Sequence, residues 1–229
     1  MKERPILFST EMVQAILDGR KTQTRRVLNP QLPFHKFDFF CGNNEAGYSA
    51  LTTKGYVEFR GYEIFENGER KYTPFYIKPK YGEKKDILWV RETWVKLNGQ
   101  YVYKADYDNG VPANEIELPN GATVDDAKWD PSIHMPKEAC RLRLKIKSIR
   151  VERLMDISEQ DAIAEGVRQR FGGFINYANP SNLFTETYPF LGRKYSAAQM
   201  SYLSLWERIN GENSFEENPW VWVIEFERA

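Results

Sequence analysis

One segment restricts the possible folds of this chain more than any other. From Arg141 to Lys147, apolar and cationic side chains alternate without a break, with Leu142, Leu144 and Ile146 between the basic residues. Successive side chains of a strand point to opposite faces, so the pattern predicts a strand with one apolar and one cationic face. The cationic face could follow a phosphate backbone. Such alternation is more typical of a solvated surface, so the fold is expected to contain a sheet that meets water on one side.

The other patterned segments are short helices and strands in irregular order. They are, along the chain, a helix that begins at Ser9 or Thr10 and ends at Gly19, a strand over 86–91 with a hairpin partner over 101–103 after the Asn98-Gly99 turn, helices over 158–166 and 196–210, and a strand over 220–226. The connections are too irregular for a doubly wound sheet. We therefore predict an α+β fold, a small closed or nearly closed mixed β-barrel with short helices packed on it.

Three stretches between these segments lack a period, namely 31–78, 106–134 and 168–195. The first contains strand-like pieces such as Tyr56–Phe59, and we expect it to form a hairpin over the core and to serve as a lid. The other two are expected to be loops. The 229 residues suit one large domain, so we predict a single domain over 1–229 that carries three insertions.

Composition predicts a compartment and argues against several classes of protein. The 32 Lys and Arg residues equal the 32 Asp and Glu residues, so a charged partner has to meet a local patch rather than an overall basic protein. No apolar run approaches the roughly 20 residues of a membrane span, and the first residues do not resemble a secretory signal. Only Cys41 and Cys140 occur, which fits a reducing compartment. We expect a cytoplasmic protein without a membrane partner.

Several kinds of catalytic centre do not fit the residues present. His35 and His134 are the only histidines, and neither has a Cys or carboxylate neighbour at ligand spacing, so no metal site is expected. Gly19-Arg20-Lys21-Thr22 superficially resembles a phosphate-binding loop, but the Walker spacing is absent. The Gly-x-Ser-x-Gly motif of serine hydrolases is also missing. We expect no metal and no cofactor.

The basic segment from Gly19 to Arg26 is the first candidate site. It contains four cations and no acid, and it is consistent with a solvated helix exit in which Arg20 and Lys21 complement the helix dipole. It is also consistent with a pocket, because Lys21 and Thr24 are three residues apart in a turn. A hydroxyl beside an amine serves either as nucleophile and base or as a pair of donors to a carbonyl oxygen.

Two further segments supply candidate residues. Glu165 lies at the end of a predicted helix, where the helix dipole opposes a carboxylate, which indicates a compensating cation such as Lys21 or an arginine nearby. The segment 89–94 reads Trp-Val-Arg-Glu-Thr-Trp. Its tryptophans are either core anchors or the wall of a groove, and its charged pair either satisfies itself or contacts a ligand.

These segments together resemble the ASCH domain family. The resemblance rests on Gly19 to Arg26 after a short helix, Gly82 to Asp86 entering Leu88-Trp89-Val90, Ser158 to Gly166, and the closing Trp222 to Phe226. The segment 89–94 and Asn218-Pro219-Trp220 are similar to the long form found in phages and prophages. The resemblance implies a PUA-like β-barrel associated with RNA, and it covers about 4–29, 79–105, 135–167 and 198–228.

The resemblance also implies an activity. A bacterial ASCH protein is an amidohydrolase of N4-acetylcytidine that uses a Lys, a Thr three residues later and a Glu in the helix after a central strand. Lys21, Thr24 and Glu165 stand at those positions here. The implied partner is therefore a modified pyrimidine nucleoside or RNA. Substrate or RNA contacts are expected from a set of neighbouring residues: Arg20, Arg25, Arg26, Trp89, Arg91, Glu92 and Trp94.

Two mechanisms and two other functions remain open at this point. Either a neutral Lys21 accepts the proton of Thr24 while Glu165 orients the substrate, or Glu165 is the base, acting on Thr24 or on water, while charged Lys21 stabilises the oxyanion. Other ASCH proteins are RNA-binding modules or ribonucleases, so the fold alone does not fix the function.

Overall fold

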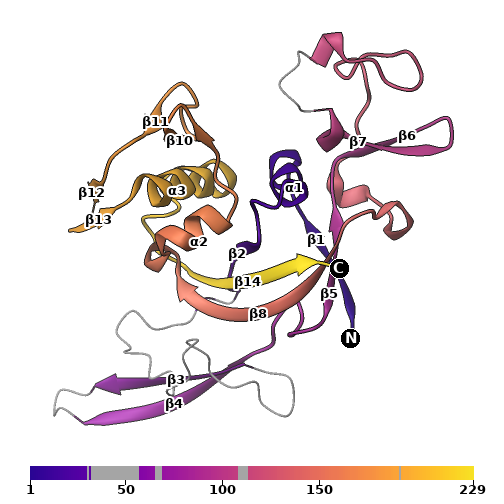
Figure 1. The fold of residues 1–229 in the computed structure, drawn as a ribbon. Coiled ribbons are helices and arrows are strands. Elements are labelled where there is room, and N and C mark those ends of the chain that lie inside the picture. The colour runs from indigo at the N-terminus through magenta and orange to yellow at the C-terminus, as the bar shows by residue number, and fades with distance from the viewer. Residues whose placement is uncertain (30, 32–56, 65–68, 108–112, 191) are drawn as a thin grey trace.

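The computed structural model describes residues 1–29, 31, 57–64, 69–107, 113–190 and 192–229 (Figure 1). Its centre is a five-stranded sheet in the order β1-β5-β8-β14-β2. The strands are β1 (Glu3–Leu7), β5 (Ile87–Arg91), β8 (Arg143–Arg153), β14 (Trp220–Arg228) and β2 (Gln23–Val27). Only β1 and β5 run parallel, and the other neighbours are antiparallel. The mixed sheet with few helices confirms the predicted α+β class.

In the described part of the chain, three α-helices cover the sheet, and each begins at a serine cap. The helices are α1 (Thr10–Leu17), α2 (Glu159–Ala164) and α3 (Ala197–Asn210). Ser9 and Ser158 accept hydrogen bonds from the third residue after them, and Ser196 forms a complete capping box with Gln199. These contacts satisfy backbone N–H groups that a helix start otherwise leaves unpaired. The three predicted helices are confirmed.

The two faces of the sheet carry two separate hydrophobic clusters. One face packs against α1, with Ile6, Leu144 and Ile224 from the strands and Val13 and Ile16 from the helix. The other face packs against α2 and α3, as Figure 1 shows. This second cluster contains Val221 and Val223 from β14 together with Ala162, Leu203 and Trp206 from the helices. Successive side chains along β14 point to opposite faces, so this strand contributes residues to both clusters.

The strand predicted over 141–147 corresponds to the first part of β8, which begins at Arg143, and the polar face of this part is solvated. Leu142, Leu144 and Ile146 are buried, whereas the basic residues between them are exposed. The expected closed barrel is not found among the described strands, because β1 and β2 remain the edges of the sheet. The two edges are nevertheless connected by one side chain, since Arg26 on β2 donates to the Leu7 carbonyl at the end of β1 at 2.6 Å.

The hairpin partner predicted for the strand over 86–91 was wrong. The segment 101–103 belongs to β7 (Gln100–Tyr103), which pairs with β6 (Trp94–Leu97), whereas β5 lies between β1 and β8. Asn98 and Gly99 both have positive φ, at 50° and 82°, as a two-residue hairpin turn requires. Such a turn joins the residues that flank it directly, so it pairs 97 with 100 rather than a more distant strand.

The first insertion contains the expected hairpin, β3 (Val57–Ile64) with β4 (Arg70–Ile77). Figure 1 shows this hairpin on the opposite side of β8 and β14 from α2 and α3. It is therefore not placed over those helices. The rest of the first insertion, including His35 and Cys41, lies outside the described residues.

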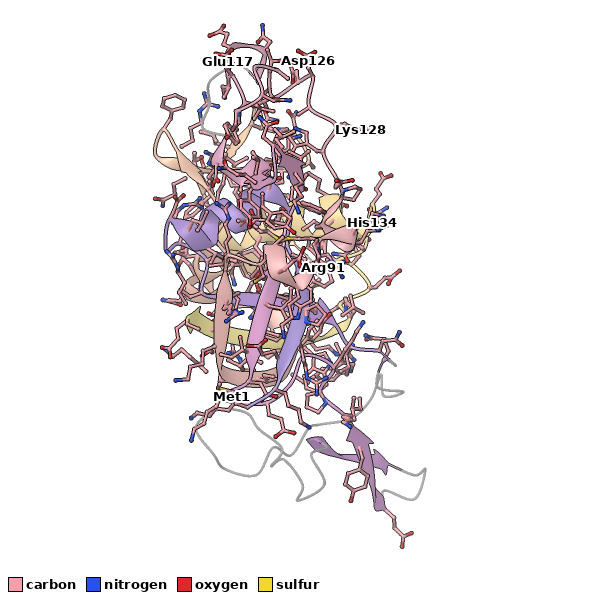
Figure 2. The ribbon with its side chains drawn as sticks, turned by 90° about the vertical axis from the view of Figure 1, so that its right-hand side faces the viewer. Met1, Arg91, Glu117, Asp126, Lys128 and His134 are labelled. Atoms are coloured by element: carbon pink, nitrogen blue, oxygen red, sulfur yellow. The ribbon has the colours of Figure 1, made fainter. Side chains whose placement is uncertain are left out.

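The other two insertions are more ordered than the loops expected there. The second contains the short 3₁₀ helices η2 (Ala113–Glu115) and η3 (Ser132–His134). A further 3₁₀ helix, η1 (Lys104–Asp106), leads into this insertion, and η4 (Lys137–Ala139) follows it before β8. The insertion packs Leu118 and Val124 against Val95 and Val102 of the β6–β7 hairpin. Figure 2 shows Glu117, Asp126 and Lys128 at one end of the molecule, away from Met1.

The third insertion forms two small sheets beside α3. Their strands are β9 (Gln169–Arg170), β10 (Gly173–Ile175) and β11 (Leu183–Phe184) in one sheet, and β12 (Tyr188–Phe190) with β13 (Arg193–Tyr195) in the other; η5 (Leu154–Asp156) precedes α2. Ser201 of α3 donates to the Ile175 carbonyl at 2.6 Å, which ties this insertion to the helix. Within the described ranges, every helix is too short or too polar to span a bilayer.

Candidate functional site

The candidate site is built around a buried ion pair between Lys21 and Glu165. Lys21 Nζ lies 2.7 Å from Glu165 Oε2 and also donates to the Glu165 carbonyl oxygen at 2.8 Å. The two residues are only 2% and 3% exposed, and an antiparallel bridge pairs their backbones. Side-chain and backbone contacts thus hold together two positions that are 144 residues apart in the sequence.

Local backbone geometry brings these two residues together. Gly19 ends α1 with φ of 76°, and Gly166 follows α2 with φ of 87°, a conformation that favours glycine. A Cβ atom on Gly166 would lie 2.9 Å from the Cβ atoms of both Ala15 and Lys21. The missing side chain at Gly166 therefore allows the end of α2 to pack directly on α1 and on Lys21.

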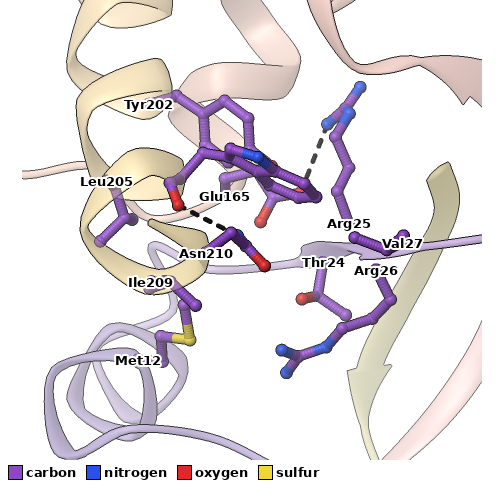
Figure 3. A pocket seen from close by; sticks show the side chains of 11 residues that line it. Met12, Thr24, Arg25, Arg26, Val27, Glu165, Tyr202, Leu205, Ile209 and Asn210 are labelled. Carbon is purple, nitrogen blue, oxygen red and sulfur yellow. Dashed lines mark hydrogen bonds and ion pairs between the residues drawn. The ribbon is translucent and has the colours of Figure 1, made fainter. Parts of the chain in front are cut away.

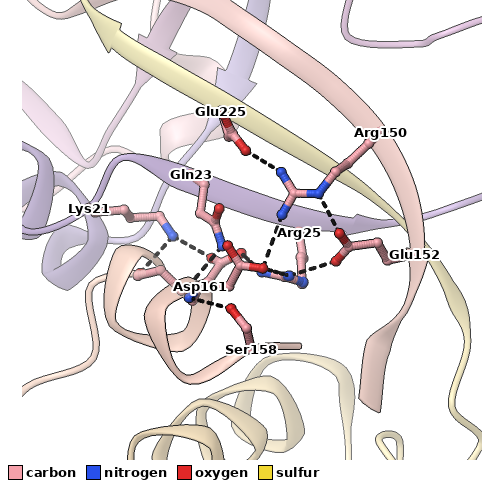
Figure 4. A network of polar contacts seen from close by, with 9 residues as sticks. Lys21, Gln23, Arg25, Arg150, Glu152, Ser158, Asp161 and Glu225 are labelled. Carbon is pink, nitrogen blue, oxygen red and sulfur yellow. Dashed lines mark hydrogen bonds and ion pairs between the residues drawn. The ribbon is translucent and has the colours of Figure 1, made fainter. Parts of the chain in front are cut away.

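Arg25 connects the pair to the sheet. Its guanidinium contacts three carboxylates, Glu152 at 2.9 Å, Asp161 at 3.0 Å and Glu165 at 3.3 Å (Figure 4). The side chain of Arg25 is fully buried. A planar guanidinium with five donors suits such a position better than an ammonium does. Glu165 is therefore shared between Lys21 and Arg25.

A second arginine extends the network along β8. Arg150 contacts Glu152, Glu225 and Asp161, the last at 3.0 Å. Burial by itself would raise the pKa of Asp161, but the charges of Arg25 and Arg150 outweigh burial and lower that pKa. The end of α2 is thus fixed to β2 and β8 by charged side chains.

The environment also shifts the pKa of Lys21. Burial lowers this pKa, because an ammonium loses its hydration, and the positive charges of Arg26 and Arg25 add to the effect. The carboxylate of Glu165 opposes the shift but does not cancel it. Lys21 consequently gives up its proton more readily than an exposed lysine.

A small cavity of about 50 Å³ lies beside the free edge of β2 (Figure 3). Its walls come from β2, the end of α2, α1 and α3, and the lining residues are Met12, Thr24, Arg25, Arg26, Val27, Glu165, Tyr202, Leu205, Trp206, Ile209 and Asn210. Both polar and apolar groups therefore face this space. Burial next to Glu165 raises the pKa of Tyr202 well above its ordinary value, so its phenol stays protonated.

The structure brings two of the three predicted catalytic residues, Lys21 and Glu165, into direct contact. The third, Thr24, lines the same cavity as Glu165, whereas Lys21 contacts Glu165 from outside it. Figure 3 shows Thr24 and Arg26 on one side of β2 and Arg25 on the other, as strand alternation requires. Among the described residues, no hydrogen bond joins the Thr24 hydroxyl to Lys21 or Glu165.

The predicted binding arginines are mostly occupied by contacts within the protein. Arg20 binds Asp18 at 2.9 Å and the Gly166 carbonyl at 3.0 Å. Arg26 lines the cavity, and its guanidinium lies 5.2 Å from the ring centre of Phe8. Arg25 holds carboxylates, as described above. The segment 19–26 is therefore more than a solvated segment after a helix, because its arginines are held by contacts within the protein.

The residues predicted in the segment 89–94 do not line this cavity. Glu92 is fully buried and accepts two hydrogen bonds from Arg141, each at 2.9 Å. Arg91 lies 5.5 Å from the Trp89 ring centre, and Figure 2 shows it near His134. Trp94 packs against Tyr101, with ring centres 5.5 Å apart. These contacts are all made within the protein, which favours the core interpretation over a ligand groove.

Several residues of the site were not predicted from the sequence. Glu152 and Asp161 bind Arg25, and Tyr202 and Trp206 line the cavity from α3. Asp161 and Glu165 are four residues apart, so they share one face at the end of α2, and that spacing was a usable signal. In the sequence of α3, Met200, Leu203, Trp206 and Ile209 form an apolar stripe that indicates only a core helix, and nothing in this pattern distinguishes the cavity wall.

Comparison of the chain with protein-family models, with curated proteins and with solved structures finds no significant match.

Proposed function

We propose that this protein is an amidohydrolase that removes a small acyl group from N4 of an acylated cytosine nucleoside. The observation that carries the proposal is the buried Lys21–Glu165 pair whose carboxylate end faces a cavity shared with Thr24. A hydroxyl can act as nucleophile, a carboxylate as base and an amine as a stabiliser of charge, so these three groups together can carry out acyl transfer. The family resemblance of the sequence points to the same three residues.

The size of the cavity supports a small acyl group. A volume of about 50 Å³ is room for only about four water-sized spheres. That space suits the three heavy atoms of an acetyl group rather than a whole nucleoside. In the proposed complex the acyl group enters the cavity, and the base and the sugar remain outside it.

The reaction proceeds in two stages in this proposal. Thr24 Oγ attacks the acyl carbon while its proton passes to Glu165, and the carbonyl π electrons move to oxygen. The tetrahedral intermediate then collapses as the bond from carbon to N4 breaks and the proton returns from Glu165 to N4. Water hydrolyses the resulting threonine ester, which releases acetate and restores the hydroxyl.

Glu165 is assigned as the base because it is the member of the pair that lines the cavity. Lys21 donates to the same carboxylate, so in this assignment it positions Glu165 and compensates its charge. The lowered pKa of Lys21 is the observation that favours the other mechanism, in which neutral Lys21 accepts the proton. Tyr202 and Trp206 complete the wall that limits water around the reacting atoms.

The proposal includes the PUA-like barrel of the ASCH family. The strand order leaves two free edges, but the contact of Arg26 with the Leu7 carbonyl joins β2 to the end of β1. The parallel β1–β5 pair within an otherwise antiparallel sheet gives the mixed character expected of that barrel. These features support a sheet that curls toward closure.

The test is the release of cytidine from N4-acetylcytidine by the purified protein, followed by absorbance. Thr24→Ala and Glu165→Gln are each expected to lower kcat by about a hundredfold or more. Thr22→Ala and Glu159→Gln are the matched controls, because both residues are exposed neighbours of the same chemical type. Both controls should keep the activity of the unmodified protein.

Two outcomes would contradict the proposal. The first is the absence of cytidine release by the unmodified protein at any substrate concentration. The second is full turnover by Glu165→Gln, which would remove the carboxylate from the reaction. Full turnover by Thr24→Ala with loss in Glu165→Gln would instead assign the attack to water.

A further inference from the structure

A second and larger cavity is lined by parts of α1 and α3 together with the third insertion. Its volume is about 220 Å³. It is lined by Glu11 and Gln14 of α1, Arg208 of α3, the chain around Arg20 and Gly166, and a part of the third insertion comprising Arg168, Arg170, Ile175, Tyr177 and Pro180. The insertion lies outside the segments that resemble the ASCH family, so this cavity is a feature of the present chain.

The charge of this cavity is strongly unbalanced. Four arginines line it against one carboxylate, Glu11, although the whole chain has no net charge. Arg208 pairs with Glu11, and Arg20 pairs with Asp18. In the part of the chain that the structure describes, Arg168 and Arg170 have no carboxylate within ion-pair distance.

Four cations around one space repel each other unless an anion joins them. Guanidinium groups present paired donors that match the oxygens of a phosphate. Arg208 also lies over Tyr177, with 5.3 Å from the guanidinium carbon to the ring centre, so its position is fixed on one side. The arrangement is therefore suited to a phosphate and leaves two arginines available for it.

Residues that are neighbours in the sequence line this cavity and form the candidate active site. Arg20 directly precedes Lys21, and Gly166 directly follows Glu165. Arg20 bridges the two segments through its hydrogen bond to the Gly166 carbonyl at 3.0 Å. The chain neighbours of both members of the ion pair thus form part of the wall of the arginine cavity.

We propose that the arginine cavity binds a phosphate of the substrate, so that the preferred substrate is a nucleotide rather than a free nucleoside. The identity of the nucleoside part rests on the proposed function. The phosphate belongs either to a free nucleotide or to a nucleotide within an RNA strand. The volume of about 220 Å³ accommodates a phosphate with part of a sugar.

The tip of the β9–β10 hairpin offers a way to distinguish these two sources. Phe171 is 86% exposed and has φ of 50°. The Arg170 guanidinium carbon lies 4.8 Å from its ring centre. An exposed aromatic ring beside arginines is the pattern on which bases of a single strand stack. Phe171→Ala is therefore expected to weaken binding of a short RNA and to leave binding of a free nucleotide unchanged.

The first experiment measures binding and needs no catalysis. Calorimetry with cytidine and with cytidine 5′-monophosphate should give about tenfold or more tighter binding of the monophosphate. The double variant Arg168→Ser/Arg170→Ser should remove that difference. The matched control Arg143→Ser/Arg228→Ser removes two exposed arginines outside the cavity. This variant should still bind the monophosphate more tightly than cytidine.

Each result decides one of the two proposals separately. Equal binding of cytidine and its monophosphate, or an unchanged preference in Arg168→Ser/Arg170→Ser, would overturn the phosphate site, whatever the hydrolysis assay shows. A monophosphate preference that depends on these arginines, without any cytidine release from the acetylated compounds, would leave the phosphate site standing and overturn the amidohydrolase. Tighter binding of a cytidine-containing RNA that Phe171→Ala weakens would identify the strand as the source.

Discussion

At the scale of single residues, the candidate site depends on a charged lysine and a glutamate that are both removed from water. Taking one charge out of water costs several kcal/mol, and a partner at hydrogen-bond distance offsets that cost only when the geometry is good. Lys21 meets this condition through two contacts with Glu165. Glu165 has a second cation, Arg25, whereas no second carboxylate among the described residues lies within ion-pair distance of Lys21. Loss of the partner side chain would therefore leave Lys21 without any counter-charge, whereas Glu165 would keep Arg25.

The lowered pKa of Lys21 gives the pair a pH dependence with a definite sign. Between the lowered value in the folded protein and the ordinary value of 10.5, the unfolded chain binds more protons at this position than the folded chain. The free energy of unfolding should therefore rise with pH through that interval. Lys21→Met lacks the group, so the difference between the unmodified protein and Lys21→Met should grow in favour of the unmodified protein as pH approaches 10.5.

Urea unfolding of both proteins at a series of pH values measures this difference. The subtraction also removes the contribution of Tyr202, whose raised pKa makes stability fall at high pH in both proteins. Parallel curves for the two proteins would show that the pKa of Lys21 is not lowered in the folded state.

Gly166 provides a second test at the residue scale. Gly166→Ala adds a Cβ atom that would lie 2.9 Å from the Cβ atoms of Ala15 and Lys21, in addition to the strain of a positive φ. Gly172→Ala is the matched control, since Gly172 has a similar φ of 81° with nothing within 4 Å of the added atom. The control should cost about 1 kcal/mol, the strain alone.

Gly166→Ala should cost clearly more than the control, by about 1–3 kcal/mol, because the overpacked atoms have to shift. It should also lower turnover, since the displaced residue is Lys21. Chemical denaturation measures the first effect and cytidine release the second. Equal losses of stability in the two variants would show that the packing at Gly166 is looser than described.

At the scale of elements, the site lies where a short helix meets an edge strand. α2 has six residues, far fewer than an isolated helix needs for stability in water. Its position depends on Ala162 in the core and on charged contacts with Arg25 and Arg150. Because β2 is an edge strand, its free side can form a cavity wall instead of pairing with another strand.

Arg25→Lys tests whether this charged contact holds the helix. A lysine keeps the charge but cannot reach three carboxylates at once. We expect a loss of about 2 kcal/mol in unfolding free energy and faster hydrogen exchange at the amides of residues 162–166. The matched control is Arg26→Lys on the same strand, whose hydrogen bond goes to a backbone carbonyl. Unchanged exchange in Arg25→Lys would mean that hydrophobic packing alone positions α2.

At the scale of the whole molecule, the long insertions surround the central sheet and its helices without covering them evenly. The third insertion packs on α3 and forms the arginine cavity. The β3–β4 hairpin lies on the opposite side of β8 and β14 from α2 and α3 (Figure 1). The described part of the first insertion is thus not placed to act as a lid on the candidate site.

Shortening that hairpin tests its separation from the site. Replacing 60–74 by Asn-Gly would join Phe59 to Phe75, which face each other in the hairpin, through a favourable two-residue turn. We expect unchanged turnover and an unchanged unfolding midpoint, because these strands pair only with each other among the described strands. Reduced kcat with unchanged stability would restore the lid hypothesis.

The sequence by itself determined the local elements of this protein. The caps at Ser9 and Ser196 and the turn at Asn98-Gly99 act on backbone groups within a few residues, so their effects can be predicted without knowing the rest of the fold. The alternation from Arg141 to Lys147 likewise fixes which face of its strand is buried. For the same reason the α+β class could be predicted, since it follows from the kinds of element present.

Only the tertiary structure decided which elements meet. Three features depend on contacts between distant parts of the chain. They are the partner of β5, the sharing of Glu165 between Lys21 and Arg25, and the position of Trp89 and Trp94 outside the cavity. Such contacts follow from the packing of whole faces, and many pairings are compatible with the same local pattern. The arginine cavity was not predictable for this reason, because its cations come from three separate segments that the fold alone brings together.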